Sequence, residues 1–330
     1  MHWNGHNAPC QKNTSQNMKR ANEMAFWATV ETMALFFILL AIGFLTAKIG
    51  IIKKEGMGQL SQLITKVFLP TLIFSMTTTS VTLDLVRDNA ILLPLSMGVY
   101  ATLAAVALAI AKILRVEHDR DRIFQFAFIF GNTGFVGFPL LTTVFHETGT
   151  LFMCMFSVVD QVLFWTYGIW LSTARGRQGA GFNVKMLASP NIIAIILALI
   201  VALSGLTLPD LVSSALSTVS RATTPMCMLF LGAMICFNKV GQTLKRPDSY
   251  ALIVVKMVAL PIIASLCASA LGLSADIIGC MVLYIALPVM TVVPMVSAQN
   301  GSEGPYATGL AVMTFVACVI TIPVVAFVAL

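Results

Sequence analysis

The sequence predicts an all-α integral membrane protein of about ten transmembrane helices. Of its 330 residues, 58% are hydrophobic and only 10% are charged, which leaves too few polar side chains to cover a soluble globule of this size. A helix needs roughly 20 mostly apolar residues to cross the hydrocarbon core of a bilayer. Such stretches recur from Met33 to Leu330. The expected spans cover residues 31–49, 58–80, 89–113, 122–145, 150–173, 187–206, 211–237, 250–272, 275–299 and 304–329.

The first thirty residues differ from the rest because they are polar and rich in asparagine. No short apolar run followed by a small-residue cleavage site occurs there, so the segment does not read as a signal peptide. For residues 1–30 we expect a disordered polar tail, or an over-long start with the true initiator at Met24 or Met33.

The charges of the loops predict the orientation. Basic residues concentrate in the connections after spans one, three, five and seven: Lys48, Lys53, Lys54, Lys112, Arg115, Arg120, Arg122, Arg175, Arg177, Lys185, Lys239, Lys245 and Arg246. The opposite side carries only Lys12, Lys19, Arg20 and Arg87. Because cytoplasmic loops retain Lys and Arg, we expect these loops in the cytoplasm and both termini outside. The net charge of +6 therefore reflects topology, and no nucleic-acid partner is expected.

Metal and enzyme chemistry are poorly supported. Six of the seven cysteines fall inside apolar spans, and all four histidines lie in loops or in the tail. No CxxC pair, Cys/His cluster or HExxH motif occurs, so we expect no metal and no cofactor. An intramembrane aspartyl protease needs two acids from different spans, whereas Asp160 stands alone. We therefore do not expect an enzyme.

Similar features recur five spans apart, which predicts two related halves. The pairs are Lys66 and Pro70 with Arg221 and Pro225, and Pro94 with Pro261. An odd number of spans per repeat makes the halves cross the membrane in opposite senses, a recurring plan of secondary transporters. We expect a first five-helix repeat over 31–173, a cytoplasmic linker over 174–186 and a second repeat over 187–330.

The fourth and ninth spans are the most interrupted. The fourth reads FGNTGFVGFPLL, and the ninth reads IALPVMTVVPMVSAQNG. Glycine makes unwinding easy, and proline inside a helix removes a hydrogen bond. In the ninth span Pro288 and Pro294 are expected to bracket the break. Kinked packing helices would explain either span alone, since Gly and Pro are common in membrane spans.

Their joint occurrence at matching positions favours a binding site. Unwinding frees backbone groups that lipid cannot satisfy, so these groups must face protein, water or a solute. Helix N-termini meeting near the midplane would favour an anion.

Four ionisable residues lie well inside the expected spans, away from their ends: Lys66, Asp160, Arg221 and Lys256. A charge at the bilayer centre costs at least about 2.5 kcal/mol, so such residues are expected to face the bundle interior. Asp160, beside Gln161, is the candidate for proton or cation coupling; alternatively it neutralises Lys66 or Arg221. Lys66 and Arg221 enter from opposite faces, and either could attract an anionic substrate. Lys256 lies near the cytoplasmic end and is expected to snorkel to the interface.

Four stretches carry a resemblance to a known family: FLPTLIF at 68–74, GNTGFVGFPLL at 131–141, TPMCMLFLGAMI at 224–235 and ALPVMTVVPMVSA at 286–298. With them the chain resembles the auxin efflux carrier family, which includes plant auxin exporters and many bacterial permeases. The resemblance implies two inverted five-helix repeats whose fourth and ninth helices are broken and cross at the substrate site. It also implies a scaffold bundle, a transport bundle that moves like an elevator, and a multi-pass location in the bacterial inner membrane.

The resemblance also implies site residues. Asn132 matches the asparagine of the first crossover motif, where its side chain would hydrogen-bond a carboxylate, and Pro139 matches the first crossover proline. Pro288 and Pro294 fall where the second crossover prolines would be, with a spacing one residue longer than in plant members. The expected substrate-binding set is Asn132, Thr133, Gly134, Gly137, Pro139, Pro288, Thr291 and Pro294. Many members carry asparagine where this chain has Asp160, and the long hydrophilic loop of the plant carriers is absent.

The expected function is secondary active transport of small organic anions such as carboxylates by alternating access. Coupling to protons or to sodium, the direction of transport and a homodimeric assembly stay open. A sodium-coupled carrier like the bile-acid symporters is an alternative, although it would want more clustered oxygen ligands than Asn132, Gln161, Gln299 and Asn300 supply. A passive channel or a solute receptor is a further alternative.

Overall fold

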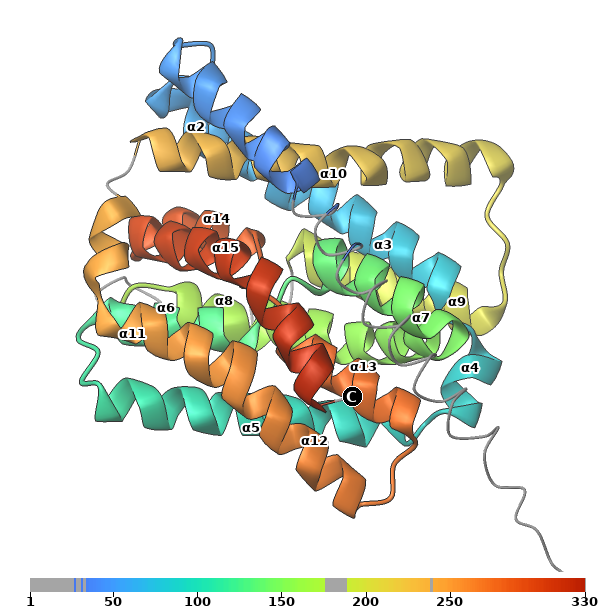
Figure 1. Cartoon of the computed structure of the whole chain (residues 1–330). Coiled ribbons are helices and arrows are strands. Elements are labelled where there is room, and N and C mark those ends of the chain that lie inside the picture. Colours follow the sequence, from blue (N-terminus) through green and yellow to red (C-terminus); the bar gives the residue numbers. More distant parts are fainter. Residues whose placement is uncertain (1–26, 28–30, 32–33, 176–188, 238–239, 330) are drawn as a thin grey trace, which may run out of the picture.

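The computed structural model describes residues 27, 31, 34–175, 189–237 and 240–329. The described residues form helices joined by short connections, so the predicted all-α class is confirmed (Figure 1). The predictions for the tail over 1–30 and the linker over 174–186 fall almost entirely outside the described residues.

Within the described residues, six helices are long and apolar enough to cross a membrane, as a multi-pass membrane protein requires. They are Lys54–Thr79, Leu92–Ile113, Thr133–Ser172, Asp210–Phe237, Pro247–Ala270 and Gly304–Val328, and the shorter apolar helices are Ala34–Lys48, Pro190–Ser204 and Ala275–Ile285. The elements are η1 (Lys54–Gly56), α2 (Met57–Leu63), η2 (Ile64–Phe68), α3 (Leu69–Ser80), α4 (Leu83–Asp88), α5 (Leu92–Ile113), α6 (Asp119–Ile129), η3 (Thr133–Gly137), α7 (Phe138–Leu163), η4 (Phe164–Gly168), α8 (Ile169–Ser172), α9 (Pro190–Ser204), α10 (Asp210–Phe237), η6 (Val240–Lys245), α11 (Pro247–Ala251), η7 (Leu252–Ala259), α12 (Leu260–Ala270), α13 (Ala275–Ile285), α14 (Val292–Gln299) and α15 (Gly304–Ala329).

The helical stretch Thr133–Ser172 bends sharply at His146. With 40 residues it would be about 60 Å long if straight, twice the thickness of a hydrocarbon core. His146 has φ 48° and ψ −117°, which turns the helix back on itself. The two arms touch so closely that a Cβ on Gly149 would lie 2.0 Å from the carbonyl oxygen of Leu141. This stretch therefore consists of two helical arms joined at His146.

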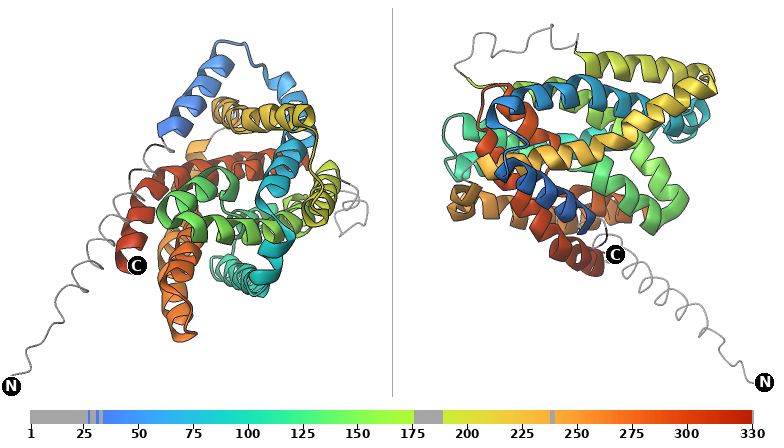
Figure 2. Two further views of the ribbon diagram at one scale, coloured as in Figure 1. Left: turned by 90° about the vertical axis from the view of Figure 1, so that its right-hand side faces the viewer. Right: turned by 90° about the horizontal axis from the view of Figure 1, so that it is seen from above.

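The helices sort into two groups by their packing. In the first group α3 packs on α9 and α10, and the helix Ala34–Lys48 crosses α10. That crossing is tight, because a Cβ on Gly43 would lie 2.3 Å from the Leu229 carbonyl oxygen and one on Gly232 would lie 2.2 Å from that of Leu40. Such small-residue contacts let helix backbones approach closely in a membrane. The second group contains α5, α6, α7, α12, α13 and α15 (Figures 1 and 2).

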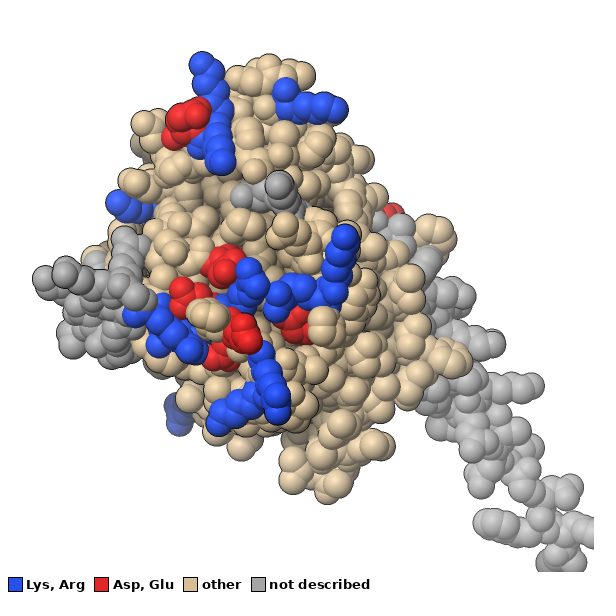
Figure 3. All heavy atoms as spheres, turned by 90° about the vertical axis from the view of Figure 1, so that its left-hand side faces the viewer, with Lys and Arg blue, Asp and Glu red and all other residues tan. Residues whose placement is uncertain are grey.

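Charged side chains gather at one end of the molecule, as Figure 3 shows. This is the end where the α5–α6 and α14–α15 connections meet η6. Two ion pairs join different segments there, Arg120–Glu303 at 3.2 Å and Arg175–Asp121 at 2.5 Å, and Arg246 pairs locally with Asp248 at 3.1 Å. The basic residues that predict the cytoplasmic side thus include a cluster at a single end.

Candidate functional site

Both interruptions expected from the sequence are present. The first separates α6, which ends at Ile129, from η3, which begins at Thr133. Asn132 caps the new helical segment, because its side-chain oxygen accepts a hydrogen bond from the N–H of Phe135 at 3.3 Å. The second interruption lies between α13 and α14, over residues 286–291.

Pro288 and Pro294 do not bracket the second interruption as expected. Pro288 lies inside it, whereas Pro294 is the third residue of α14. Proline is tolerated in the first turn of a helix because the N–H at that position has no partner within the helix. Pro294 therefore belongs to the start of α14.

The two interruptions cross each other. Gly131 and Val289 form an antiparallel bridge, in which the N–H of Asn132 donates to the Pro288 carbonyl at 2.7 Å and the N–H of Met290 donates to the Phe130 carbonyl at 3.2 Å. The N–H of Val289 donates to the Thr314 hydroxyl of α15 at 3.0 Å. Each unwound segment thus satisfies backbone groups of the other, which an apolar medium requires.

Glycine in the first interruption makes room for Leu287 of the second. A Cβ on Gly131 would lie 3.0 Å from the Leu287 Cβ, and one on Gly137 would lie 2.7 Å from the Leu287 Cδ1. A Cβ on Gly134, by contrast, would meet nothing within 4 Å. Close approach of the two segments therefore depends on Gly131 and Gly137, and Gly134 faces open space.

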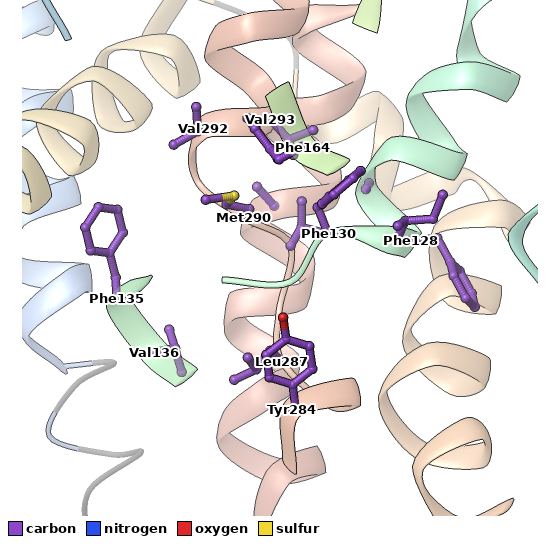
Figure 4. Close-up of a cluster of buried hydrophobic side chains, with 14 of the residues drawn as sticks. Phe128, Phe130, Phe135, Val136, Phe164, Tyr284, Leu287, Met290, Val292 and Val293 are labelled. Atoms are coloured by element: carbon purple, nitrogen blue, oxygen red, sulfur yellow. The ribbon is translucent and has the colours of Figure 1, made fainter. Parts of the chain in front are cut away.

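Aromatic rings surround the crossing on the side of the second helix group (Figure 4). The ring of Phe130 packs on Phe164 with centroids 5.2 Å apart, and that of Phe156 packs on Tyr284 at 5.0 Å. Figure 4 shows Phe135 apart from the other labelled aromatic residues, on the opposite side of the crossing. The crossing therefore has a filled aromatic side and a second side where Phe135 lies.

A pocket lies on the Phe135 side, between α3 and the crossing. It is lined by Leu69, Leu72, Ile73, Met76, Thr77, Thr133, Gly134, Phe135, Phe138, Met153, Ser157, Gln161, Trp165, Met290 and Val292. The lining is mainly apolar with a few polar groups, which is typical of small-molecule sites. Its accessible volume is about 40 Å³, room for only a few water molecules. The pocket joins one helix group to the other, since α3 belongs to the first and the crossing to the second.

Two buried side-chain groups beside the crossing have no hydrogen-bond partner among the described residues. They are the amide nitrogen of Asn132 and the hydroxyl of Thr291, in residues that are 0% and 1% exposed. An unsatisfied buried polar group costs about 1–3 kcal/mol, so proteins keep few of them. The neighbours of both residues, Thr133 on one side and Met290 with Val292 on the other, line the pocket.

Asp160 of α7 is fully buried and bonded to hydroxyl groups. Tyr100 of α5 donates a short hydrogen bond to one carboxylate oxygen, and Thr133 donates to the other at 3.1 Å. The hydroxyl of Tyr284 lies 2.6 Å from that of Tyr100. Because Thr133 also lines the pocket, a single hydrogen bond connects the pocket to the carboxylate.

The expectation that Asp160 neutralises Lys66 or Arg221 does not describe the structure, because both basic side chains are exposed. They therefore do not face the bundle interior as expected. The guanidinium of Arg221 donates to the hydroxyl of Ser217 on its own helix at 2.9 Å. Neither side chain lines the pocket.

The prediction that Lys256 snorkels to the interface is wrong. Its side chain is 1% exposed, and its ammonium group donates to the carbonyl of Ala127 at 3.2 Å. Ala127 lies in the last turn of α6, where carbonyl groups lack helical partners and the helix dipole is negative. Lys256 thus caps the end of α6 just before the first interruption.

The predicted site residues do not gather in one place. Thr133, Gly134 and Gln161 line the pocket, and Asn132, Pro288 and Thr291 lie at or beside the crossing. Gly137 and Pro294 are buried in packing contacts, and the side chain of Pro139 is exposed. Lys66 and Arg221 are exposed and belong neither to the pocket nor to the crossing. Sequence reasoning missed Tyr100 and Tyr284, although a tyrosine within an apolar span signals a need for a hydroxyl partner.

An all-helical membrane protein in which two broken helices cross beside a pocket has the architecture of a membrane transporter. The comparison with protein families agrees, since the membrane transport protein family matches residues 28–184 and 179–326. The chain belongs to this family, the auxin efflux carrier family.

Two archaeal relatives are similar to the chain. An uncharacterized transporter of Methanothermobacter thermautotrophicus is 24% identical over 217 residues, which cover 65% of this chain and 70% of the relative. An uncharacterized transporter of Methanocaldococcus jannaschii is 26% identical over 215 residues, which cover 62% of this chain and 68% of the relative.

Proposed function

We propose that the protein is a secondary active transporter of small organic anions such as carboxylates. In this proposal ten spans form two inverted repeats over 31–173 and 187–330, linked through 174–186, in the cell membrane with both termini outside. The observation that carries the proposal is the crossing of the two interruptions beside a pocket, with the buried, unpartnered amide of Asn132 next to it.

The chemistry of the crossing favours an anion. The amide nitrogen of Asn132 is a hydrogen-bond donor that the described residues leave unused. The first residue of α14, Val292, lines the pocket, so the N-terminal end of this helix faces the same space. Unpaired N–H groups and the positive end of the helix dipole stabilise negative charge. A carboxylate meets both requirements, because it accepts hydrogen bonds and carries a negative charge.

The position of the pocket supports an elevator motion. Its walls come from α3 in the first helix group and from the crossing in the second. A volume of about 40 Å³ leaves little room for an organic acid, so the two groups must separate for substrate to enter. We propose that the α3–α9–α10 group is the scaffold and that the second group carries the crossing through the membrane.

The hydrogen bond between Thr133 and Asp160 supports a coupling role for the carboxylate, with Gln161 on the pocket wall beside it. Protonation of Asp160 would weaken it as an acceptor for Thr133 and so change the donors that the pocket offers. Buried carboxylates in membrane spans commonly serve as proton relays.

Counterflow in proteoliposomes tests the function. Purified protein is reconstituted in vesicles loaded with unlabelled mono- or dicarboxylate, and uptake of the labelled acid is measured with sodium, or with choline in its place. Concentrative exchange of at least one carboxylate supports the carrier. Large ohmic current without exchange would indicate a channel, binding without flux would indicate a receptor, and exchange that requires sodium would indicate the sodium-coupled alternative.

A further inference from the structure

A second pocket lies on the outer face of the second helix group, away from the pocket described above. It encloses about 160 Å³ and is lined by Met97, Tyr100, Ala101, Ala104, Ile129, Phe130, Leu163 and Tyr167. Apart from two tyrosines the lining is apolar. Met97 and Ala101 are exposed at the surface of the chain, so in a membrane this groove opens toward lipid.

Basic residues stand at one end of this groove. Lys112 is exposed in the last turn of α5. It lies eleven residues after Ala101, which is about three helical turns along the same helix. The helix rise places them about 16 Å apart along the axis, close to half of the roughly 30 Å hydrocarbon core. Arg122 of α6 lies seven residues before Ile129, that is, two turns toward the same end. Lys112 and Arg122 thus flank the groove at the depth of the headgroups.

Aromatic side chains mark the same level. The ring of Tyr167 stacks on that of Trp170 with centroids 5.6 Å apart, and the guanidinium of Arg122 lies 4.6 Å from the centre of the Trp170 ring. Tyrosine and tryptophan are enriched where a membrane protein meets the interface. Arg122 donates one hydrogen bond, to the carbonyl of Thr173 at 3.2 Å, and a guanidinium has five donors.

The acids nearest to Arg122 in the sequence have other hydrogen-bond partners. Asp121 pairs with Arg175 at 2.5 Å, and the backbone N–H of Arg175 donates to Asp119 at 2.9 Å. Arg122 therefore keeps donors for an anion at the mouth of an apolar groove. An apolar groove with cations at the headgroup level is complementary to a lipid that has an apolar chain and an anionic headgroup.

We propose that this groove binds an anionic phospholipid of the cytoplasmic leaflet, with one acyl chain between α5 and α7 and the phosphate on Lys112 and Arg122. The inference rests on the proposed orientation in the membrane and is independent of any transported substrate. The acyl chain of the lipid would contact the ring of Tyr100, whose hydroxyl group donates a hydrogen bond to Asp160. The bound lipid therefore touches the residue that orients the buried carboxylate.

Native mass spectrometry of the purified full chain tests the proposal. The protein is incubated with phosphatidylglycerol or phosphatidylcholine of equal chain length, and retained lipid is counted. We expect preferential retention of phosphatidylglycerol, and a fall of about tenfold or more in the Lys112→Gln/Arg122→Gln double variant. The matched control is Lys53→Gln/Lys54→Gln, which removes two exposed cations at the start of η1 and should retain the lipid.

Two further variants separate lipid binding from folding. Ala104→Phe fills the groove without changing charge and should also lose the lipid, whereas Arg122→Lys keeps the charge and should retain most of it. Equal retention of both lipids, equal losses in the control and double variants, or a stable dimer without bound lipid would overturn the proposal. A failure of carboxylate exchange would leave this binding result unchanged, so the two proposals can fail separately.

Discussion

The two interruptions meet in space but are built from different residues. The first consists of Phe130, Gly131 and Asn132, and the adjoining Thr133 donates a hydrogen bond to Asp160. The second runs from Ala286 to Thr291 and has only one polar side chain, that of Thr291. Both provide backbone hydrogen bonds to the crossing. The difference shows that two halves can share a geometry while one of them supplies most of the chemistry.

The largest expected effect comes from Asn132→Ala. Loss of a hydrogen bond to a charged group costs about 1.5–3 kcal/mol, so carboxylate uptake should fall by about 10- to 100-fold. Initial rates in proteoliposomes over a substrate series measure this. Ser157→Ala is the matched control for removing a small polar group from the pocket wall, because its hydroxyl already donates to the Cys154 carbonyl. Equal effects of the two variants would show that the first interruption does not bind the substrate.

Asp160→Asn should flatten the pH dependence of uptake. If one proton accompanies each substrate, uptake by the unmodified protein changes by up to about tenfold per pH unit, and the amide cannot follow it. Asp276→Asn is the control, since this exposed acid lies at the start of α13, the helix that leads into the second interruption. A pH profile that survives Asp160→Asn but not Asp276→Asn would assign the coupling to the other half.

Gly137→Ala should destabilise the protein, whereas Gly134→Ala should not. The new Cβ at 137 would lie 2.7 Å from Leu287, and at 134 it would meet nothing within 4 Å. Overpacking of a filled contact costs about 1–3 kcal/mol. Thermal unfolding in detergent compares the two variants. It is monitored with a dye that does not react with cysteine, or by size-exclusion chromatography. If the two variants unfold at the same temperature, the contact between residue 137 and Leu287 does not hold the two segments in place.

The smallest effect is expected for Thr291→Val, which keeps the shape and removes the hydroxyl. A neutral hydrogen bond contributes about 0.5–1.5 kcal/mol, so uptake should fall by about tenfold at most. The same uptake assay compares the initial rate of Thr291→Val with that of Asn132→Ala. A loss as large as that of Asn132→Ala would mean that the two interruptions contribute equally to binding.

The interruptions could be predicted because their causes are local. Glycine spacing in GNTGFVGFP and the prolines of ALPVMTVVP indicate unwinding without knowledge of any neighbour. The position of a charged side chain within a membrane span depends on residues that are far away in the sequence. Lys256 could snorkel or find an internal partner, and the choice depends on where α6 ends, which hydropathy does not reveal. Lys66 and Arg221 were expected inside for the same general reason and lie at the surface.

The tyrosines illustrate the same limit. Tyr100 and Tyr284 lie on different spans, and only their packing beside α7 brings the Tyr100 hydroxyl to Asp160 and the Tyr284 hydroxyl to that of Tyr100. In sequence each is an isolated aromatic residue in an apolar segment. A network of three side chains from three helices leaves no spacing pattern in the sequence.

The burial of Lys256 and Asp160 in one helix group has a consequence for membrane voltage. If this group moves through the bilayer, both side chains travel with it, and when both are ionised their opposite charges displace no net charge. A single unpaired charge would add about 2.3 kcal/mol of electrical work per 100 mV across the full field. The empty carrier should then return at a rate nearly independent of potential, and the electrogenicity of the cycle would be set by the anion it carries.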